Sequence, residues 1–459
     1  MLVIGGVIGS GIFRKPGVMA AQLGAPELLL FVWLLGGLIT LMGALTNAEI
    51  AAMIPETGGQ YVFFHRIYGP FFAFIYGWAV LVVIQTGSIA AVAYVFAEYS
   101  GRFVALPPDP GFASISMHLP FIGEIAPFKD LWTKAVAAAA IIGLTALNYV
   151  GVRFGGLVQN VFTLGKLAAM ALLVMAAFLL PSGGSVQNLT ASSLSIQPHG
   201  WMLVASIAAA LQGAFWAYDG WNKVPYVAGE MKDPQRILPR ALLVGMLTVT
   251  GVYLLMNFTY AYVLPIDEMA RSKLVAADVA ERCIRGGGRW IAAAVMVSTF
   301  GAANAIILAT ARVFFAMARA NALPPAFGAA HPRFHTPGAS LILQGVWSVL
   351  LLFSGTFDTL TDMLIFVSWI FYAAAAAGVF ILRRREPETP RPYRVPGYPW
   401  VPALFIAFSL AYLVLTVVND VNGYLAAQRA GQPAVINSVF GVALVLAGVP
   451  LFFLFRRRS

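Results

Sequence analysis

The sequence is dominated by long runs of apolar residues that contain no charged side chain. Most of these runs approach the roughly 20 residues that a helix needs to cross a bilayer. They cover Leu28–Ala48, Phe71–Ala97, Ala135–Gly151, Leu167–Leu180, Gly200–Tyr218, Ala241–Ile266, Trp290–Ala311, Pro337–Phe357, Met363–Leu382, Val401–Asn419 and Gly431–Phe455. Only 10% of the 459 residues are charged, which is too few to solvate soluble domains of this total length. The sequence therefore predicts an all-α polytopic membrane protein and excludes a soluble enzyme, a nucleic-acid-binding protein and a disordered chain.

The N-terminal segment from Met1 to about Gln22 is a further candidate span, because it is apolar except for Arg14 and Lys15. A re-entrant segment or a signal peptide would reduce the count to eleven spans. A signal peptide carries its positive charge before the apolar stretch, whereas here the charge lies within it. We therefore predict twelve transmembrane helices.

Lysine and arginine are more frequent in the loops that follow even-numbered spans, as at Arg383, Arg384 and Arg385. Because cytoplasmic loops are enriched in these residues, both termini are predicted to be cytoplasmic, in the plasma or inner membrane of the cell. The loop after the seventh span carries both acidic and basic residues, so we expect a short folded extracellular segment there.

The first and sixth spans are each interrupted near their middle. Gly9-Ser10-Gly11 interrupts the first, and Asp219-Gly220 followed by Pro225 interrupts the sixth. A break exposes N–H groups and the positive end of a helix dipole, which suits a carboxylate, although glycines also serve close helix packing. Breaks at corresponding positions of two five-span sets indicate an inverted-repeat transporter with a site near the midplane. Asp219 would then contact substrate, cap the second half-helix, or do both.

Five other charged or polar positions lie at or inside spans. Lys166 in the fifth span either snorkels or provides a fixed ammonium beside the first break. Asn304 in the eighth span either lines the site or bonds to a neighbouring helix. We expect Glu98 to be solvated at the outer end of the third span, whereas Arg14 and Lys15 either line an outer vestibule or pair with acids.

The sequence predicts no cofactor and no metal site. All five histidines fall in loops or at span edges, away from acidic clusters, and the chain has no GxxxxGK[ST] motif for ATP. The single cysteine, Cys283, excludes an internal disulfide framework.

Four segments resemble the amino acid–polyamine–organocation (APC) superfamily, most closely the L-type amino acid transporter family and its bacterial relatives. They are Gly6-VIGSGIFRKPG, Asn47-AEIAAMIPETGGQYVFFHRIYG, Trp216-AYDGWNKVPYVAGEMKDPQRILPRA and Arg391-PYRVPGYPWVP, in the family's order along the chain. The resemblance implies a LeuT-like fold in a single transporter domain. Its two inverted five-helix repeats would occupy residues 1–180 and 200–384, and the two further helices residues 399–456.

The resemblance also implies the residues of the substrate site. The substrate carboxylate is expected at N–H groups around Ser10, Gly11 and Ile12, and its amino group at carbonyls near Val7, Ile8, Trp216 and Asp219. Gly9, Ala217 and Gly220 belong to the same unwound segments. Trp216 is expected to close over the substrate from outside, Lys166 to match a lysine of sodium-independent members, and Asn304 to match a polar position of the eighth span.

By this resemblance, the expected function is sodium-independent exchange of L-amino acids by alternating access. Neutral substrates are expected, and Asp219 adds cationic ones as candidates because members that accept them share Ala-Tyr-Asp-Gly-Trp-Asn. A proton-coupled symporter, with Lys166 or Asp219 carrying the proton, is the alternative transport mode, and an amino acid receptor or channel is the alternative class.

Two features depart from the family. Animal members are joined to a glycoprotein partner through a cysteine after the third span, but residues 102–134 contain none, so no disulfide-linked heavy chain is expected. Only eight residues precede Gly9, about 12 Å of helix against the roughly 15 Å of half a bilayer core. We therefore expect Met1 to be an internal methionine or the inner half-helix to be truncated.

Overall fold

The structure is a computed structural model that describes residues 2–56, 58–120, 122–151, 155–180, 184–192, 198–230, 233–320 and 322–456. Within these residues, ten helical segments are long and apolar enough to cross a membrane. They are α3 (Pro26–Met53), α5 to α6 (Pro70–Ser100), α7 (Leu131–Val150), α8 (Gly155–Leu179), α9 (Trp201–Tyr218), α10 (Pro234–Val263), α13 (Gly287–Arg319), α15 (Phe357–Arg385), α16 (Trp400–Arg429), and α17 (Asn437–Leu446) with α18 (Gly448–Arg456). The chain is thus a multi-pass membrane protein, as the apolar runs predict.

Two of the twelve expected spans are not among these ten membrane-length segments. The ninth is α14 (Gly338–Leu352), which is apolar but has only 15 residues. The first is divided into α1 (Leu2–Val7) and α2 (Gly11–Leu23). The tenth span begins earlier than its charge-free run, at Phe357, because Asp358 and Asp362 in its first turns pair with a lysine from α2.

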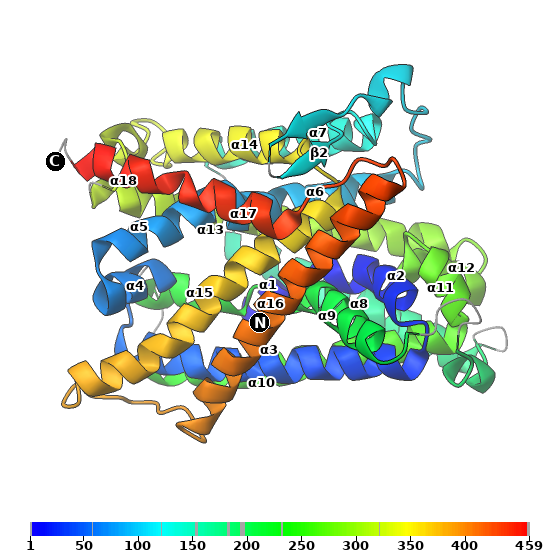
Figure 1. The fold of residues 1–459 in the computed structure, drawn as a ribbon, viewed down its shortest axis with the longest axis horizontal. Helices are drawn as coiled ribbons and strands as arrows, with labels where there is room; N and C mark the ends of the chain where they lie inside the picture. Colours follow the sequence, from blue (N-terminus) through cyan, green and yellow to red (C-terminus); the bar gives the residue numbers. More distant parts are fainter. Residues whose placement is uncertain are drawn as a thin grey trace.

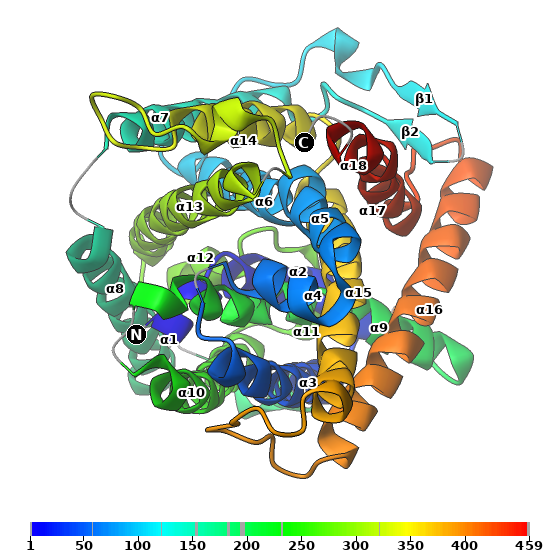
Figure 2. The ribbon, with the colours of Figure 1, turned by 90° about the vertical axis from the view of Figure 1, so that its left-hand side faces the viewer.

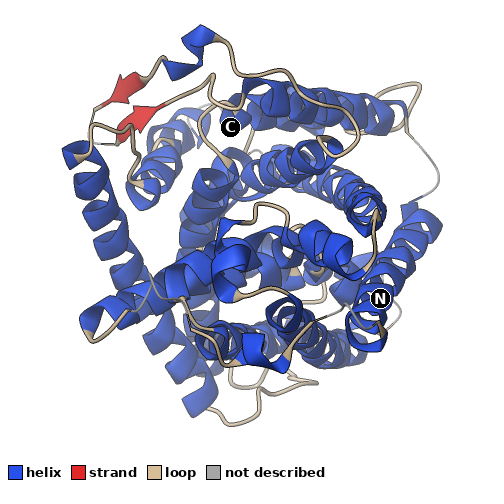
Figure 3. Cartoon of the chain, turned by 90° about the vertical axis from the view of Figure 1, so that its right-hand side faces the viewer, coloured by secondary structure: helices blue, strands red, loops and turns tan. Residues whose placement is uncertain are grey.

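Short elements connect the long helices. They are α4 (Gln60–Tyr68), a π-helical turn η1 (Val80–Ile84) between α5 (Pro70–Ala79) and α6 (Gln85–Ser100), α11 (Ile266–Arg271), α12 (Val275–Cys283), and the 3₁₀ turns η2 (Gly111–Ser114), η3 (Val186–Leu189), η4 (Trp221–Glu230) and η5 (Pro325–Gly328). Helices α11 and α12 form the folded segment expected after the seventh span. Among the described residues, the exception to an all-α chain is an antiparallel hairpin (Figure 3). It is formed by β1 (Met117–Leu119) and β2 (Gly123–Ile125), with His118 opposite Glu124.

The long helices run between two ends of the molecule. Helix α4 and the C-terminus lie at one end, and α11 and α12 lie at the other (Figure 1). Viewed along this direction, α4 lies in front, with α3 and α10 on one side and α6 and α13 on the opposite side (Figure 2). The most extensive helix pairings are α3 with α10, α6 with α13 and α2 with α9. Each pairs a helix of the expected first repeat with its counterpart in the second.

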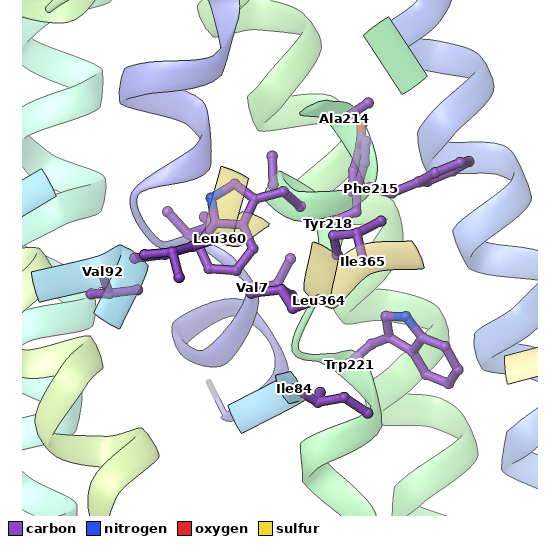
Figure 4. Packing of buried hydrophobic residues seen from close by; sticks show 14 of the residues in the cluster. Val7, Ile84, Val92, Ala214, Phe215, Tyr218, Trp221, Leu360, Leu364 and Ile365 are labelled. Atoms are coloured by element: carbon purple, nitrogen blue, oxygen red, sulfur yellow. The ribbon is translucent and has the colours of Figure 1, made fainter. Parts of the chain in front are cut away.

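A continuous apolar core fills the space between these helices. Figure 4 shows part of it, where Val7, Val92, Phe215 and Leu364 come from α1, α6, α9 and α15. Burial of such side chains from helices distant in the sequence fixes the two interrupted spans against the rest of the bundle.

One ion-pair cluster joins two of the sequence segments that carry the family resemblance. Glu49 of α3 is buried, and its carboxylate accepts hydrogen bonds from Nε and Nη2 of Arg383 of α15, at 2.8 and 2.7 Å. Its Oε2 also accepts the backbone N–H of Val395 at 2.8 Å. The Arg383 guanidinium lies over the ring of Tyr398, 3.7 Å from its centroid. This forked pair ties α3 to α15 and to the loop before α16.

Candidate functional site

The first span is broken where the sequence predicts. Helix α1 ends at Val7, residues 8–10 form a bend, and α2 begins at Gly11. The N–H groups of Phe13 and Arg14 return to the Ser10 carbonyl, at 3.2 and 3.1 Å. Those of Ser10, Gly11 and Ile12 have no acceptor within the described ranges. A helix N-terminus with free donors is a general site for anionic groups.

The carbonyl end of α1 is bonded by two side chains from other helices. Lys166 of α8 donates to the Gly5 carbonyl at 2.9 Å and also to the Ile8 carbonyl. Its side chain is buried, so it does not snorkel to the membrane surface. The Tyr253 hydroxyl of α10 lies within hydrogen-bond distance of the Val7 carbonyl, at 3.1 Å. Carbonyl groups left free by the break therefore have donors, and Lys166 lies beside the break as its second interpretation predicts.

The sixth span breaks at Asp219 and Gly220, between α9 and η4. Asp219 is extended, with φ −65° and ψ 152°, and Gly220 has φ +113°, a region that disfavours other residues. A Cβ on Gly220 would lie 2.5 Å from the Gly6 carbonyl oxygen. The two breaks are therefore in direct backbone contact.

A second close approach joins the other halves of the broken spans. A Cβ on Gly11 would lie 2.5 Å from the Cα of Ala217, so α2 begins against the last turn of α9. The Tyr253 hydroxyl that reaches Val7 also lies 2.9 Å from the Ala217 carbonyl. Because the hydroxyl has only one proton, it donates to the two carbonyls in turn or shares one hydrogen bond between them. Tyr253 thus links the two breaks to α10.

Two buried polar atoms, one in the first break and one in the last turn of α9, have no hydrogen-bond partner among the residues that the structure describes. They are the Ser10 hydroxyl and the Trp216 indole N–H. The Trp216 ring is buried, with an edge-to-face contact to Phe357 of α15 at 6.0 Å between centroids. Buried polar groups normally have partners, so these two are candidates to bind a polar ligand.

Charged residues connect α2 to α6 and α15 just beyond the first break. Arg14 donates to Glu98 of α6 at 3.0 Å, and Lys15 donates to Asp358 and Asp362 of α15 at 2.8 and 3.4 Å. Of the two interpretations of Arg14 and Lys15, pairing with acids is therefore the correct one. The expectation of a solvated Glu98 is wrong, because its side chain is 13% exposed and paired.

Asp219 is buried between α15 and its own segment. Its Oδ1 accepts the Tyr372 hydroxyl of α15 at 2.6 Å, and its Oδ2 lies 3.7 Å from the Lys223 ammonium. In the part of the chain that the structure describes, this carboxylate is thus contacted by side chains and not by the N–H groups of η4, which a cap would use. Asn304 of α13 accepts the Asn148 amide of α7 at 2.7 Å, the helix-to-helix bond of its second interpretation.

The chain matches the family described as "Amino acid permease" over residues 1–446. It belongs to this family. The match covers both breaks, Lys166, Tyr253 and all ten membrane-length segments except the end of the last. The resemblance to the APC superfamily is thereby confirmed.

Characterised relatives of this permease are similar over nearly the whole chain. The serine/threonine exchanger SteT of Bacillus subtilis is 32% identical, with 100% of this chain and 95% of the relative aligned. The large neutral amino acids transporter small subunit 2 of mouse is 32% identical over 99% of this chain and 79% of the relative. The human b(0,+)-type amino acid transporter 1 is 28% identical, with 99% and 86% covered. These relatives are transporters and not enzymes.

Sequence reasoning missed several polar residues of this permease, namely Tyr253, Tyr372, Lys223, Asp358 and Asp362. Tyr253 and Tyr372 lie within apolar runs, where tyrosine is ordinary. Asp358 and Asp362 could have been found, because two acids one helical turn apart face the same side and require a counter-charge.

Replacing Tyr253 by phenylalanine is expected to lower amino acid transport by about tenfold. The change removes one hydroxyl and leaves two buried carbonyls without this donor, a loss of roughly 1–3 kcal/mol. The measurement is uptake of labelled amino acid into proteoliposomes. The control is Tyr68→Phe, which removes a hydroxyl bonded to the Ala374 carbonyl at 2.7 Å. Equal activity of the Tyr253 variant and wild type would show that the link between the breaks is dispensable.

Proposed function

We propose that this permease is a sodium-independent exchanger of L-amino acids that works by alternating access. The observation that carries this proposal is the direct contact of two broken helices, with free N–H groups on one side and carbonyl groups on the other. An amino acid zwitterion presents the complementary pair of charges. The exchange mode is favoured by the similarity to SteT, a serine/threonine exchanger.

The proposed fold is LeuT-like, with twelve spans. Residues 1–180 and 200–384 form the two inverted repeats, and residues 399–456 add two helices. The pairings of α2 with α9, α3 with α10 and α6 with α13 support this division, because each joins equivalent helices of the two repeats.

The substrate carboxylate is bound by the N–H groups of Ser10, Gly11 and Ile12, which lack acceptors in the described parts of the chain. The substrate amino group meets carbonyls of Val7, Ile8 and the Trp216–Asp219 turn. Val7 and Ile8 already accept from Tyr253 and Lys166, but a carbonyl oxygen has two lone pairs and can accept again. The remaining residues of the proposed site are Gly9, Ala217, Gly220 and Asn304.

Lys166 accounts for the proposed independence from sodium. Its ammonium is buried and bonded to two carbonyls at the end of α1. Carbonyl oxygens of an unwound helix are also the ligands that transporters offer to a coupling cation. A fixed ammonium at this position supplies a positive charge that belongs to the protein, so no ion has to enter with the substrate.

The ion pairs beyond the first break serve as the outer gate in this proposal. Arg14 and Lys15 hold α2 to α6 and α15, and Trp216 packs against Phe357 between this layer and the site. These contacts close one side of the site in the present conformation. Alternating access then requires them to separate while contacts at the other end form.

The proposed function is tested by uptake of a panel of labelled L-amino acids into proteoliposomes that contain the purified protein and internal amino acid. Uptake of at least one amino acid at equal rates in sodium and choline buffers is expected. Binding without flux would indicate a receptor, and uptake that needs sodium would contradict the proposed independence from sodium.

We further propose that the protein lies in the cell membrane with both termini in the cytoplasm. A cysteine placed at Gln187, which is exposed on η3, is expected to react with a membrane-impermeant maleimide added outside intact cells. The parent chain is the control, since its one cysteine, Cys283, is buried in α12. Labelling of Gln187→Cys only after the cells are opened would mean that the orientation is inverted. The burial of Cys283 also favours a chain without a disulfide-linked heavy-chain partner.

A further inference from the structure

Lys223 lies four residues after Asp219, on the far side of the second break. Its ammonium is 3.7 Å from Oδ2 of Asp219, and the two side chains are 19% and 5% exposed. The other carboxylate oxygen accepts the Tyr372 hydroxyl at 2.6 Å. Both oxygens of this acid therefore have partners that belong to the protein itself.

Asp219 is close to where the two breaks meet. The next residue, Gly220, has its ideal Cβ position 2.5 Å from the Gly6 carbonyl oxygen and 3.5 Å from the Cα of Val7. The Asp219 N–H is bonded to the carbonyl of Trp216 at 3.3 Å. The backbone turn that carries Asp219 is thus in contact with the first break, where the substrate is proposed to bind.

The fixed charges that these contacts assign to the two breaks are one carboxylate, Asp219, and two ammonium groups, Lys166 and Lys223. A neutral zwitterion leaves this balance unchanged. An amino acid with a positive side chain adds a second uncompensated positive charge, and it finds the carboxylate already paired. To use Asp219, it would have to displace Lys223 first.

We infer that Lys223 is a counter-ion that occupies Asp219 and excludes amino acids with positively charged side chains from the site. This inference rests on the proposed function and specifies its substrate class. It also reverses the expectation from sequence that Asp219 adds cationic substrates. The acid alone would attract them, whereas the acid with its own lysine excludes them.

The test compares uptake of labelled L-serine and labelled L-arginine in proteoliposomes for wild type, Lys223→Gln, Lys223→Arg and the double variant Asp219→Asn/Lys223→Gln. Wild type should prefer serine. Lys223→Gln should raise the arginine-to-serine ratio by about tenfold, the order of effect of one close charge pair. Lys223→Arg should keep the wild-type ratio, and the double variant should lose the gain.

A matched control is Arg236→Gln. This change also removes one positive charge from a pair with an aspartate, at 3.8 Å from Asp233, but both side chains are exposed. It should leave the ratio unchanged. A ratio that rises equally in this control would reflect general loss of positive charge and would overturn the inference.

The remaining outcomes are also decisive. Wild type that transports arginine as readily as serine overturns the inference, whatever the variants do and even if Lys223→Gln fails to fold. An unchanged ratio in a folded Lys223→Gln protein means that the pair only holds η4 in place. Folded wild type that transports no amino acid contradicts the proposed function itself, which separates the two failures.

Discussion

Replacing Lys166 by alanine is expected to lower amino acid exchange by about 100-fold or more at neutral pH. The lysine makes two buried hydrogen bonds, to the carbonyls of Gly5 and Ile8. Hydrogen bonds from a charged donor contribute about 1.5–3 kcal/mol each, so the pair is worth about 3–6 kcal/mol, and each 1.4 kcal/mol is a factor of ten. Losing them frees the end of α1 from α8 and removes the fixed positive charge.

The measurement is the initial rate of exchange in proteoliposomes, together with the melting temperature of the purified variant. Lys129→Ala is the control, because it removes an exposed lysine far along the chain from either break. If Lys166→Ala keeps full exchange, the lysine has no role in coupling. If added sodium restores exchange to this variant alone, the ammonium acts in place of a cation, as proposed.

The second large effect is expected from Gly220→Ala, which should abolish most transport. A methyl group at this position would lie 2.5 Å from the Gly6 carbonyl oxygen and would also occupy a backbone conformation with φ +113°. Neither backbone can yield without separating the two breaks. Strain of this kind costs on the order of 1–3 kcal/mol before any clash is counted, so transport should fall at least tenfold.

The control for this prediction is Gly251→Ala in α10, where an added Cβ meets nothing within 4 Å. It should transport like wild type and be slightly more stable, because alanine favours a helix by up to about 1 kcal/mol over glycine. Both variants are compared by uptake and by melting temperature. Wild-type transport by Gly220→Ala would mean that the two breaks do not need to touch.

Much of the fold could be predicted from the sequence because membrane spans depend on length and apolarity alone. The limits appear where a charge lies inside a span. Asp358 and Asp362 interrupt the apolar run, yet α15 continues through both because Lys15 compensates them. Such a partner comes from a helix more than 300 residues away, and local composition carries no information about it. Apolarity also does not set the ends of a helix, since α14 is shorter than the apolar run Pro337–Phe357 that contains it. The hairpin at Met117 was missed because it does not lie in a long apolar run.

The positions of the two breaks were predictable because glycine and aspartate are costly in the middle of a membrane helix. The residues that contact the two breaks were less predictable. Lys166 could be predicted because it is a charged residue inside a membrane span, and the structure places it against the first break. Tyr253 was missed, because a tyrosine in an apolar run is more often part of the core. Asp219 and Lys223 are four residues apart, so their pairing could have been considered from the sequence. Only the structure shows that the pair forms across the break.

The most direct test of exchange is trans-stimulation in sodium-free proteoliposomes. Vesicles with purified protein are loaded with unlabelled serine or left empty, and the uptake of external labelled serine is followed. The account predicts that loaded vesicles take up label at least several times faster than empty ones. Equal rates in loaded and empty vesicles, or uptake into empty vesicles that requires a pH gradient, would contradict it.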